Sequence, residues 1–346
     1  MKAVCFDQFQ GPLSLTDVPD PRPAPDGVVV RVHATGVCRS DWHAWQGHDP
    51  DVRLPHVPGH ELAGTIETVG ASVQRWKPGD RVTVPFVCGC GQCSPCLTGD
   101  PQVCLHQFQP GFTGWGSFAE RVALRHADGN LVRLPDSLDF VEAASLGCRF
   151  VTAFRAVVAL GQARPGEWVV IHGCGGVGLA ATMIAVAAGA QVIAVDMRRA
   201  ALDAARDMGA AHLIEVAPSS DPLAEIRDIT QGGAHLSLDA LGHPETCQRS
   251  ILGLRPRGRH VQVGLLLGNH SQPPVPMATV IARELQLFGS HGMAAHAYPP
   301  LLDLIVAGRL KPGRLVRRQI QLEEVPETLQ RMGSFLDPGI SVVKVL

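Results

Sequence analysis

The feature that most constrains the fold is a regular alternation of apolar strands and helices in the second half of the chain. It begins with the apolar run Trp168–His172, which a glycine-rich loop joins to an alanine-rich helical segment at 177–188. Further strands are expected at 191–195, 212–216, 236–239, 260–264 and 285–289, and further helices at 200–208 and 223–229. Strands that are buried on both faces and alternate with helices indicate a parallel sheet. Six strands in this order predict a doubly wound α/β fold that binds a dinucleotide.

The first 150 residues have a different character, rich in turns and short strands. Alternation of apolar and polar residues predicts strands at 27–34, 62–70 and 79–84, and helical periodicity is weak there. The character changes after Cys148, and residues 150–160 are expected to form a helix. The last part carries one expected helix, at 298–307, and a terminal strand at 341–346. We therefore expect a β-rich domain over 1–150, a dinucleotide-binding domain over 151–290 and a C-terminal segment over 291–346.

Composition excludes several classes of function. A chain of 346 residues fits two domains of ordinary size, and 45% hydrophobic residues suffice for a sizeable core. The net charge of −2 provides no basic field for nucleic acid or for an anionic membrane. The apolar N-terminal run is interrupted by Asp7, unlike a signal peptide, and no stretch of 18 apolar residues occurs. We expect a cytoplasmic protein whose partners are small molecules.

The most specific motif is a loop of four cysteines. The chain has ten cysteines, and five of them lie between Cys88 and Cys104. Two-residue gaps turn the chain back on itself, so four thiolates at these spacings can surround a tetrahedral ion and leave no position for water. That arrangement is typical of a structural zinc; free or disulfide-bonded cysteines and an iron–sulfur cluster are the alternatives. The four candidate ligands are Cys90, Cys93, Cys96 and Cys104.

Three short segments elsewhere carry further potential metal ligands. Cys38 follows an expected strand, His60 precedes one, and Cys148 lies at the boundary between the two expected domains. Each is weak alone, because a single cysteine or histidine in an apolar setting is more often a packed core residue. Together they offer two sulfurs and one imidazole, which would leave a fourth coordination position open.

These motifs resemble those of one known family. The segment Gly36-Val37-Cys38-Arg39-Ser40-Asp41, the triplet Gly59-His60-Glu61, the four-cysteine loop and the glycine loop 173–178 occur in this order over nearly the whole chain. Together they resemble the zinc-dependent medium-chain alcohol dehydrogenases. The resemblance implies a GroES-like catalytic domain, to which the C-terminal segment returns, and a Rossmann domain that binds NAD. It also implies two zinc ions per chain, one catalytic and one structural, and a homotetramer or a dimer.

The resemblance assigns roles to individual residues. Cys38, His60 and Cys148 correspond to the ligands of the catalytic zinc, although the family also uses aspartate or glutamate at the third position. Glu61 corresponds to a carboxylate near the metal, and Asp41 to an acid that orients the histidine ligand. The remaining matches are the proton relay, Ser40 and His43, and a residue that meets the cofactor pyrophosphate, Arg39.

The glycine loop has the context that a dinucleotide-binding motif requires, because it follows an apolar strand and opens a helix. Its glycines permit a tight turn, close approach of the pyrophosphate and close packing of helix on strand. The loop consists of Gly173, Cys174, Gly175, Gly176, Val177 and Gly178. Asp196 ends the next strand, where an acid binds the adenosine ribose and repels a 2′-phosphate, so NAD is expected over NADP. Arg198 and Arg199 lie close by and could soften this preference, although a solvated helix start is the simpler interpretation.

Aromatic residues suggest the character of the substrate pocket. Phe86 lies where the family places a pocket aromatic, Trp42 precedes the relay histidine, and Trp115 lies in a Gly-Trp-Gly-Ser loop. These residues predict small uncharged primary or secondary alcohols, or their aldehydes and ketones, as substrates. A polyol dehydrogenase on the same fold would favour a carboxylate third ligand and a more polar pocket. A metal-free quinone or enone reductase would lack the ligands Cys38 and His60, and a non-enzymatic binding protein would not need a proton relay.

Overall fold

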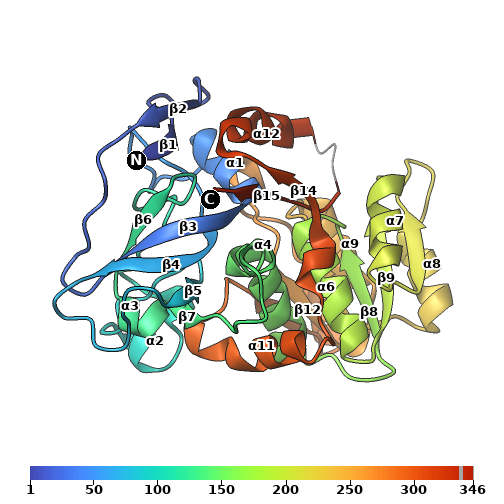
Figure 1. Ribbon diagram of the computed structural model, residues 1–346. Coiled ribbons are helices and arrows are strands. Elements are labelled where there is room, and N and C mark those ends of the chain that lie inside the picture. The colour runs from blue at the N-terminus through green and yellow to red at the C-terminus, as the bar shows by residue number, and fades with distance from the viewer. Residues whose placement is uncertain (335–337, 346) are drawn as a thin grey trace. The chain divides into compact units, whose positions relative to one another are not determined.

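The computed structural model describes residues 1–334 and 338–345 of the chain. It divides into two compact units, of which the first comprises residues 1–151 and 292–346 and the second comprises residues 152–291. Within the part that the structure describes, no helix is both long and apolar enough to cross a membrane. Figure 1 shows the elements of each unit.

The second unit is built on a six-stranded sheet in which every neighbouring pair of strands is parallel. The strand order is β10-β9-β8-β11-β12-β13, which is the order of a Rossmann fold with β8 as its first strand. The predicted doubly wound sheet is therefore confirmed. Its strands are β8 (Trp168–His172), β9 (Gln191–Asp196), β10 (His212–Glu215), β11 (Ala234–Asp239), β12 (Leu254–Gln262) and β13 (Gln286–Gly289).

Helices connect these strands, and all of them except α10 bury apolar residues. The first, α6, begins at Gly176 within the glycine loop, and a Cβ atom on Gly178 would overlap the carbonyl oxygen of Gly173. Only glycine allows this close packing of helix on loop. Asp221 caps α8 by accepting hydrogen bonds from the backbone N–H groups of Leu223 and Ala224. The helices are α6 (Gly176–Ala187), α7 (Arg199–Asp207), α8 (Pro222–Thr230), α9 (Pro244–Leu252) and α10 (Met277–Ala282).

Two features of this unit differ from the sequence-based expectation. Strand β12 begins at Leu254, six residues before the expected start. Its first half was not predicted because Pro256 and Gly258 are typical turn residues. The register between β11 and β12 shifts between Ala234 and Leu236, which accommodates that irregular half. Helices α9 and α10 were not expected, although α9 has nine residues, as many as α7 and α8.

The first unit is built on a mainly antiparallel sheet of order β14-β15-β3-β4-β5-β7, with β6 paired to β3. Its longest strand, β3, also pairs with β4 and β15, so the C-terminal strand lies beside the N-terminal part of the chain. Leu346, the last residue of the expected terminal strand, lies outside the described residues. The strands are β3 (Val28–Val37), β4 (Glu61–Val69), β5 (Arg81–Thr83), β6 (Arg121–Leu124), β7 (Val132–Arg133), β14 (Val316–Ile320) and β15 (Ile340–Lys344), with β1 (Lys2–Cys5) and β2 (Ser14–Asp17) as a separate pair.

Short helices fill the connections of this unit. The segment expected as one helix over 150–160 is instead irregular: a π-helix at Leu146–Phe150 lies in the first unit, one α-helical turn, α5 (Val151–Phe154), spans the boundary between the two units along the chain, and a second π-helix at Arg155–Leu160 belongs to the second unit. Such π-helical turns are rare and occur frequently at functional sites. The other helices are α1 (Arg39–Trp45), α2 (Ser94–Leu97), α3 (Ala127–Asn130), α4 (Phe140–Ala144), α11 (Pro299–Val306) and α12 (Val325–Arg331).

Candidate active site and metal centres

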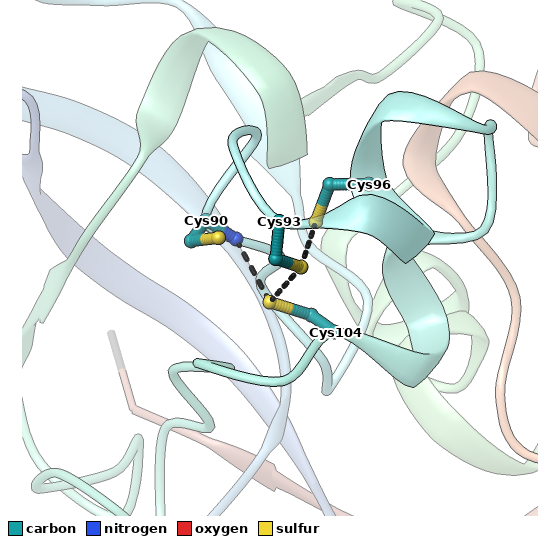
Figure 2. Close-up of side chains that lie close together, drawn as sticks. All are labelled: Cys90, Cys93, Cys96 and Cys104. Carbon is teal, nitrogen blue, oxygen red and sulfur yellow. Dashed lines mark hydrogen bonds between the residues drawn. The ribbon is translucent and has the colours of Figure 1, made fainter.

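The four-cysteine loop closes on itself. Figure 2 shows the side chains of Cys90, Cys93, Cys96 and Cys104 turned toward a common centre. One ligand atom from each lies within 4.8 Å of all the others, and the Cys93 sulfur is 3.5 Å from that of Cys96. Helix α2, which begins at Ser94, and a 3-10 turn at Pro101–Val103 carry the chain around this centre. Four sulfur ligands and no further donor fit a closed tetrahedral zinc site.

A second cluster joins three distant segments of the first unit. Cys38 lies between β3 and α1, His60 directly precedes β4, Glu61 is the first residue of β4, and Cys148 lies in the first π-helix. One ligand atom from each of these four residues lies within 4.8 Å of the others. The structure thus brings together the three ligands that the resemblance implied, and it places the Glu61 carboxylate beside them.

His60 is held in one orientation by Asp41. Both side chains are fully buried, and the Nδ1 atom of His60 is 2.7 Å from the Asp41 carboxylate. The same carboxylate accepts hydrogen bonds from the backbone N–H groups of Cys38 and Gly59. Asp41 therefore fixes the imidazole so that Nε2 is the free nitrogen. That Nε2 atom is buried and has no hydrogen-bond partner among the described residues, as expected of a nitrogen that binds a metal ion.

Glu61 is bound by Arg149, the residue that follows Cys148. The Arg149 Nε atom lies 2.9 and 3.1 Å from the two carboxylate oxygens, and Nη2 also donates to Glu61. The backbone N–H of Arg149 donates to the same carboxylate at 3.0 Å. Both side chains are buried, and Gly36 leaves the space that they occupy, because a Cβ atom there would overlap the Glu61 carboxylate. Burial raises the pKa of Glu61, and the Arg149 charge opposes that rise.

The two sulfurs of this cluster differ in their preference for the thiolate. The hydrogen bond from Cys148 holds the pKa of Cys38 well below its usual range, and the Arg149 guanidinium acts in the same direction. The same hydrogen bond raises the pKa of Cys148. Because metal ligation requires thiolates, a cation beside the cluster favours the ligating form of both sulfurs.

Ser40 and His43, to which the resemblance assigns a proton relay, both lie on α1. The Ser40 hydroxyl is 3.8 Å from the Cys38 sulfur. Further along the helix, the His43 ring is partly buried, and its Nδ1 atom lies 2.9 Å from the Nδ1 atom of His48. Arg39 donates a hydrogen bond to the backbone carbonyl of Met332, and its guanidinium lies 4.5 Å from the Trp42 ring centroid. Ser40 therefore lies next to the metal cluster, and His43 extends toward the surface.

The predicted pocket aromatics lie in different places. The Phe86 ring is 6.3 Å from the His60 ring, whereas Trp42 packs beside His43 at 5.0 Å, measured between ring centroids. Trp115 instead lines a surface cavity of about 320 Å³ together with Met1, Arg22 and other residues, none of which belongs to the metal cluster. Phe112 lies 5.1 Å from the His60 ring and was missed by the sequence analysis.

The cofactor loop follows β8 as predicted. Gly173 adopts a positive φ of 90°, and a Cβ atom on Gly175 would meet open space, so the loop leaves its outer side accessible. The backbone N–H groups at the start of α6 provide an anion-binding end. Asp196 ends β9 and accepts a 2.8 Å hydrogen bond from the backbone N–H of Cys174 and a 2.9 Å bond from that of Arg198. This open glycine cradle with an acid at the end of the second strand fits a dinucleotide.

Arg149 is the most important residue that the sequence analysis left without a role. A charged residue directly after a potential ligand, within the mainly apolar run 144–154, is the signal that could have identified it. Its partner Glu61 is 88 residues away, so sequence spacing alone cannot pair them.

Comparison with known proteins identifies the family. Residues 24–136 match the alcohol dehydrogenase GroES-like domain, and residues 176–307 match the zinc-binding dehydrogenase domain. The chain is 34% identical to an alcohol dehydrogenase of Geobacillus stearothermophilus, and the match covers the full length of both chains. It is 36% identical to an NAD-dependent alcohol dehydrogenase of Sulfurisphaera tokodaii, with 99% of each chain covered.

Solved structures agree with this assignment. An alcohol dehydrogenase from Thermus sp. ATN1 superposes with a TM-score of 0.91 at 32% identity and with full coverage of both chains. The benzyl alcohol dehydrogenase of Acinetobacter calcoaceticus also gives a TM-score of 0.91, at 26% identity, with 100% of this chain and 99% of that one covered. The chain is therefore an oxidoreductase and belongs to the zinc-dependent medium-chain dehydrogenase/reductase family.

Proposed function

We propose that the protein is a zinc-dependent, NAD-linked alcohol dehydrogenase with one catalytic and one structural zinc per chain. The observation that carries the proposal is the cluster of Cys38, His60 and Cys148, in which the oriented and buried His60 Nε2 has no hydrogen-bond partner in the part of the chain that the structure describes. Two sulfurs and one imidazole from separated segments make a catalytic ligand set with one position open to substrate. The closed site of Cys90, Cys93, Cys96 and Cys104 would hold the structural zinc.

The cofactors supply the electrophile and the hydride acceptor: zinc polarises the oxygen of an alcohol or carbonyl, and NAD exchanges hydride with its carbon. The chain's own residues would position and deprotonate the substrate. Asp41 keeps His60 in the ligating tautomer, and Arg149 holds the Glu61 carboxylate within the cluster. Ser40 lies next to Cys38, where it can take the hydroxyl proton, and His43 is the next member of the relay.

The support for NAD is the position of Asp196 at the end of β9. A carboxylate there binds the ribose hydroxyls and repels a 2′-phosphate. Arg198 interacts with this carboxylate at 3.3 Å, so its charge is already engaged by Asp196. NAD is therefore the expected cofactor, in agreement with the similarity to the NAD-dependent alcohol dehydrogenase of Sulfurisphaera tokodaii.

We further propose that the substrates are small uncharged alcohols with apolar or aromatic substituents, and their aldehydes or ketones. Phe86 and Phe112 both contact the region of the His60 ring, and each buried methylene of a substrate would contribute roughly 0.8 kcal/mol against such a surface. The similarity to a benzyl alcohol dehydrogenase supports the same class. Trp115 is not needed for this pocket.

One set of experiments tests the whole proposal. Elemental analysis of the freshly purified protein should give two zinc ions per chain. Reduction of NAD, followed at the nicotinamide absorbance, should then rank kcat/KM across ethanol, hexanol, benzyl alcohol, a secondary alcohol, sorbitol and lactate. Sorbitol or lactate at the top of that ranking would contradict the substrate class, and the absence of zinc from active enzyme would contradict the mechanism.

We also propose that the protein forms a homotetramer or a homodimer. Strand β13 ends the six-stranded sheet, so one of its edges has no partner strand among the described residues. The neighbouring α10 exposes Met277 and Ile281, the latter at 73%, and β13 exposes Leu287. An unpaired edge next to exposed apolar side chains favours association with another chain. Light scattering coupled to size exclusion would measure the mass, and a monomer of 36.8 kDa would contradict the proposal.

A further inference from the structure

Two histidines at the end of α1 are joined by a direct hydrogen bond. His43 lies on α1, and His48 follows the turn that ends this helix. Their Nδ1 atoms are 2.9 Å apart, and the backbone N–H of His48 donates to the His43 carbonyl at 3.0 Å. The His43 ring is partly buried, whereas His48 is exposed. The pair therefore spans the distance from the interior of the first unit to solvent.

A hydrogen bond between two Nδ1 atoms constrains both rings. A neutral imidazole has one donor and one acceptor nitrogen, so one ring carries its proton on Nδ1 and the other on Nε2. Burial lowers the pKa of His43 to about 4, and the charges of Arg39 and His48 add to this effect. His43 is therefore neutral at physiological pH and can accept a proton on one nitrogen while it releases one from the other.

The charged groups around the pair do not replace His48 as the partner of His43. On α1 itself, Arg39 disfavours the protonated ring and the Cys38 thiolate favours it. On α12, which packs against α1, the nearby charges of Glu327 and Arg331 pair with each other. Asp49 follows His48 in the loop, and its carboxylate accepts a hydrogen bond from the backbone N–H of Asp51.

We propose that His48 is the solvent-side member of a two-histidine proton relay, which acts through His43. The proposal rests on the alcohol dehydrogenase function above. The proton that leaves the alcohol binds to His43 Nε2 as the Nδ1–H bond of His43 breaks and its proton moves to His48 Nδ1. The Nε2–H bond of His48 then breaks and that proton passes to water. One proton moves from the substrate to solvent, no electrons are transferred to the imidazoles, and exchange with solvent restores the starting tautomers.

His48 could instead serve only to fix the His43 ring, and two substitutions separate these roles. In His48→Asn, an amide near the position of Nδ1 can keep the hydrogen bond to His43 but cannot relay a proton. His48→Ala removes both the hydrogen bond and the relay. If His48 only positions His43, the asparagine variant behaves like the wild type; if His48 relays protons, the asparagine variant behaves like the alanine variant. His48 is exposed, so neither change should disturb folding.

The experiment uses the holoenzyme with NAD and benzyl alcohol, or the best substrate of the panel above. Stopped-flow measurement with a pH indicator follows proton release, and nicotinamide absorbance follows hydride transfer. We expect both His48 variants to slow proton release about tenfold and to shift the pH profile of kcat. This is less than the roughly 10²–10⁴-fold contribution of a direct general acid or base, because His48 acts through His43. Added imidazole should restore the rate of His48→Ala. His296→Ala, which removes another exposed histidine of the same unit, is the matched control.

A second measurement does not depend on turnover. Nitrogen-15 NMR of the histidine side chains should show His43 neutral and hydrogen-bonded through Nδ1, and His48→Ala should change the tautomer populations of His43. The relay is wrong if His48→Asn keeps the wild-type proton release and pH profile, or if neither variant differs from the His296 control. Failure of the wild type to oxidise any alcohol would instead refute the proposed function, and the NMR result would remain interpretable.

Discussion

Removal of the Arg149 side chain should destabilise the first unit more than any other single loss of a charge. Arg149 is 6% exposed and Glu61 is fully buried, and three donors of Arg149 bind the carboxylate. Arg149→Met would leave a buried carboxylate without its counter-charge. Breaking a buried ion pair in this way costs about 3–5 kcal/mol. For a unit of about 200 residues, this loss corresponds to a fall of roughly 6–20 °C in Tm.

The assay is thermal and urea denaturation, followed by tryptophan fluorescence, after mild chelation has emptied the open Cys38 site, so that no metal can bind the Glu61 carboxylate. Trp42, Trp45, Trp76 and Trp115 all report on the first unit. The variants are Arg149→Met, Glu61→Gln and the double variant. Because the double variant contains no buried charge at this position, it should recover much of the stability that Arg149→Met loses. This recovery is the signature of an ion pair, since two independent contacts would give additive losses.

The matched control is Lys2→Met, which removes one partner of the exposed pair Lys2–Asp17 in the same unit. Exposed ion pairs contribute little, so this variant should unfold almost like the wild type. A loss below about 1 kcal/mol for Arg149→Met, or a double variant less stable than Arg149→Met, would refute the reasoning.

Three further predictions follow from the sites. Mild chelation should remove the zinc of the open Cys38 site, and activity with it, before it removes the zinc of the closed four-cysteine site or unfolds the protein, as measured by metal content, turnover and circular dichroism. Asp196→Gly should lower kcat/KM with NAD and raise it with NADP, because the charge that repels a 2′-phosphate is gone; a wild type that prefers NADP would contradict this assignment. Burial lowers the pKa of His172 to about 3 and that of His260 to about 4, from 6.5, so the unfolded chain binds more protons between these values and stability should fall as the pH drops from 6.5 to 4. In His172→Phe, the dependence of Tm on pH over this range should become weaker, and an unchanged slope would contradict the cause.

Local motifs could be predicted from the sequence because neighbouring residues determine them. The four cysteines lie within 15 residues, and the glycine loop is set by the strand before it and the helix after it. The parallel sheet could also be predicted, because strands buried on both faces consist of continuous apolar runs. The first half of β12 was missed, since Pro256 and Gly258 favour a turn locally and the pairing of Leu254 with Ala234 of β11 cannot be inferred from neighbouring residues.

Contacts between distant segments could not be obtained in the same way. The Asp41–His60 pair was expected only through the family resemblance, whereas the Glu61–Arg149 pair was not expected at all. The hydrogen bond between His43 and His48 spans only five residues, but it depends on the turn that ends α1. Trp115 was expected in the substrate pocket but lies elsewhere. Its indole donates a hydrogen bond to the Pro55 carbonyl, the next residue in its loop bonds to Val57, and Trp115 lines a separate surface cavity. In each case, tertiary packing decides which side chains meet.

Asp41 and Glu61, the two buried carboxylates of the proposed active site, are held by different kinds of hydrogen-bond donor. This difference indicates that the two residues have different functions. Asp41 accepts hydrogen bonds from two backbone N–H groups and from the imidazole of His60, the proposed metal ligand. Its partners are therefore held by the main chain and by that ligand. Glu61 is held by the side chain and backbone of one residue, Arg149, which is covalently joined to the ligand Cys148. A shift of Glu61 toward the metal would therefore have to break contacts with the segment that carries a ligand, whereas a shift of Asp41 would release the orientation of His60. Arg149 is thus expected to restrain Glu61 while the fourth coordination position takes the substrate.

Zinc release to a chelator should accordingly become slower in Arg149→Met, because the freed carboxylate can supply a fourth protein ligand. Glu61→Gln in the same background should reverse the effect. Faster release in Arg149→Met, with no change on adding Glu61→Gln, would show that Arg149 serves only to hold the Cys148 segment in place.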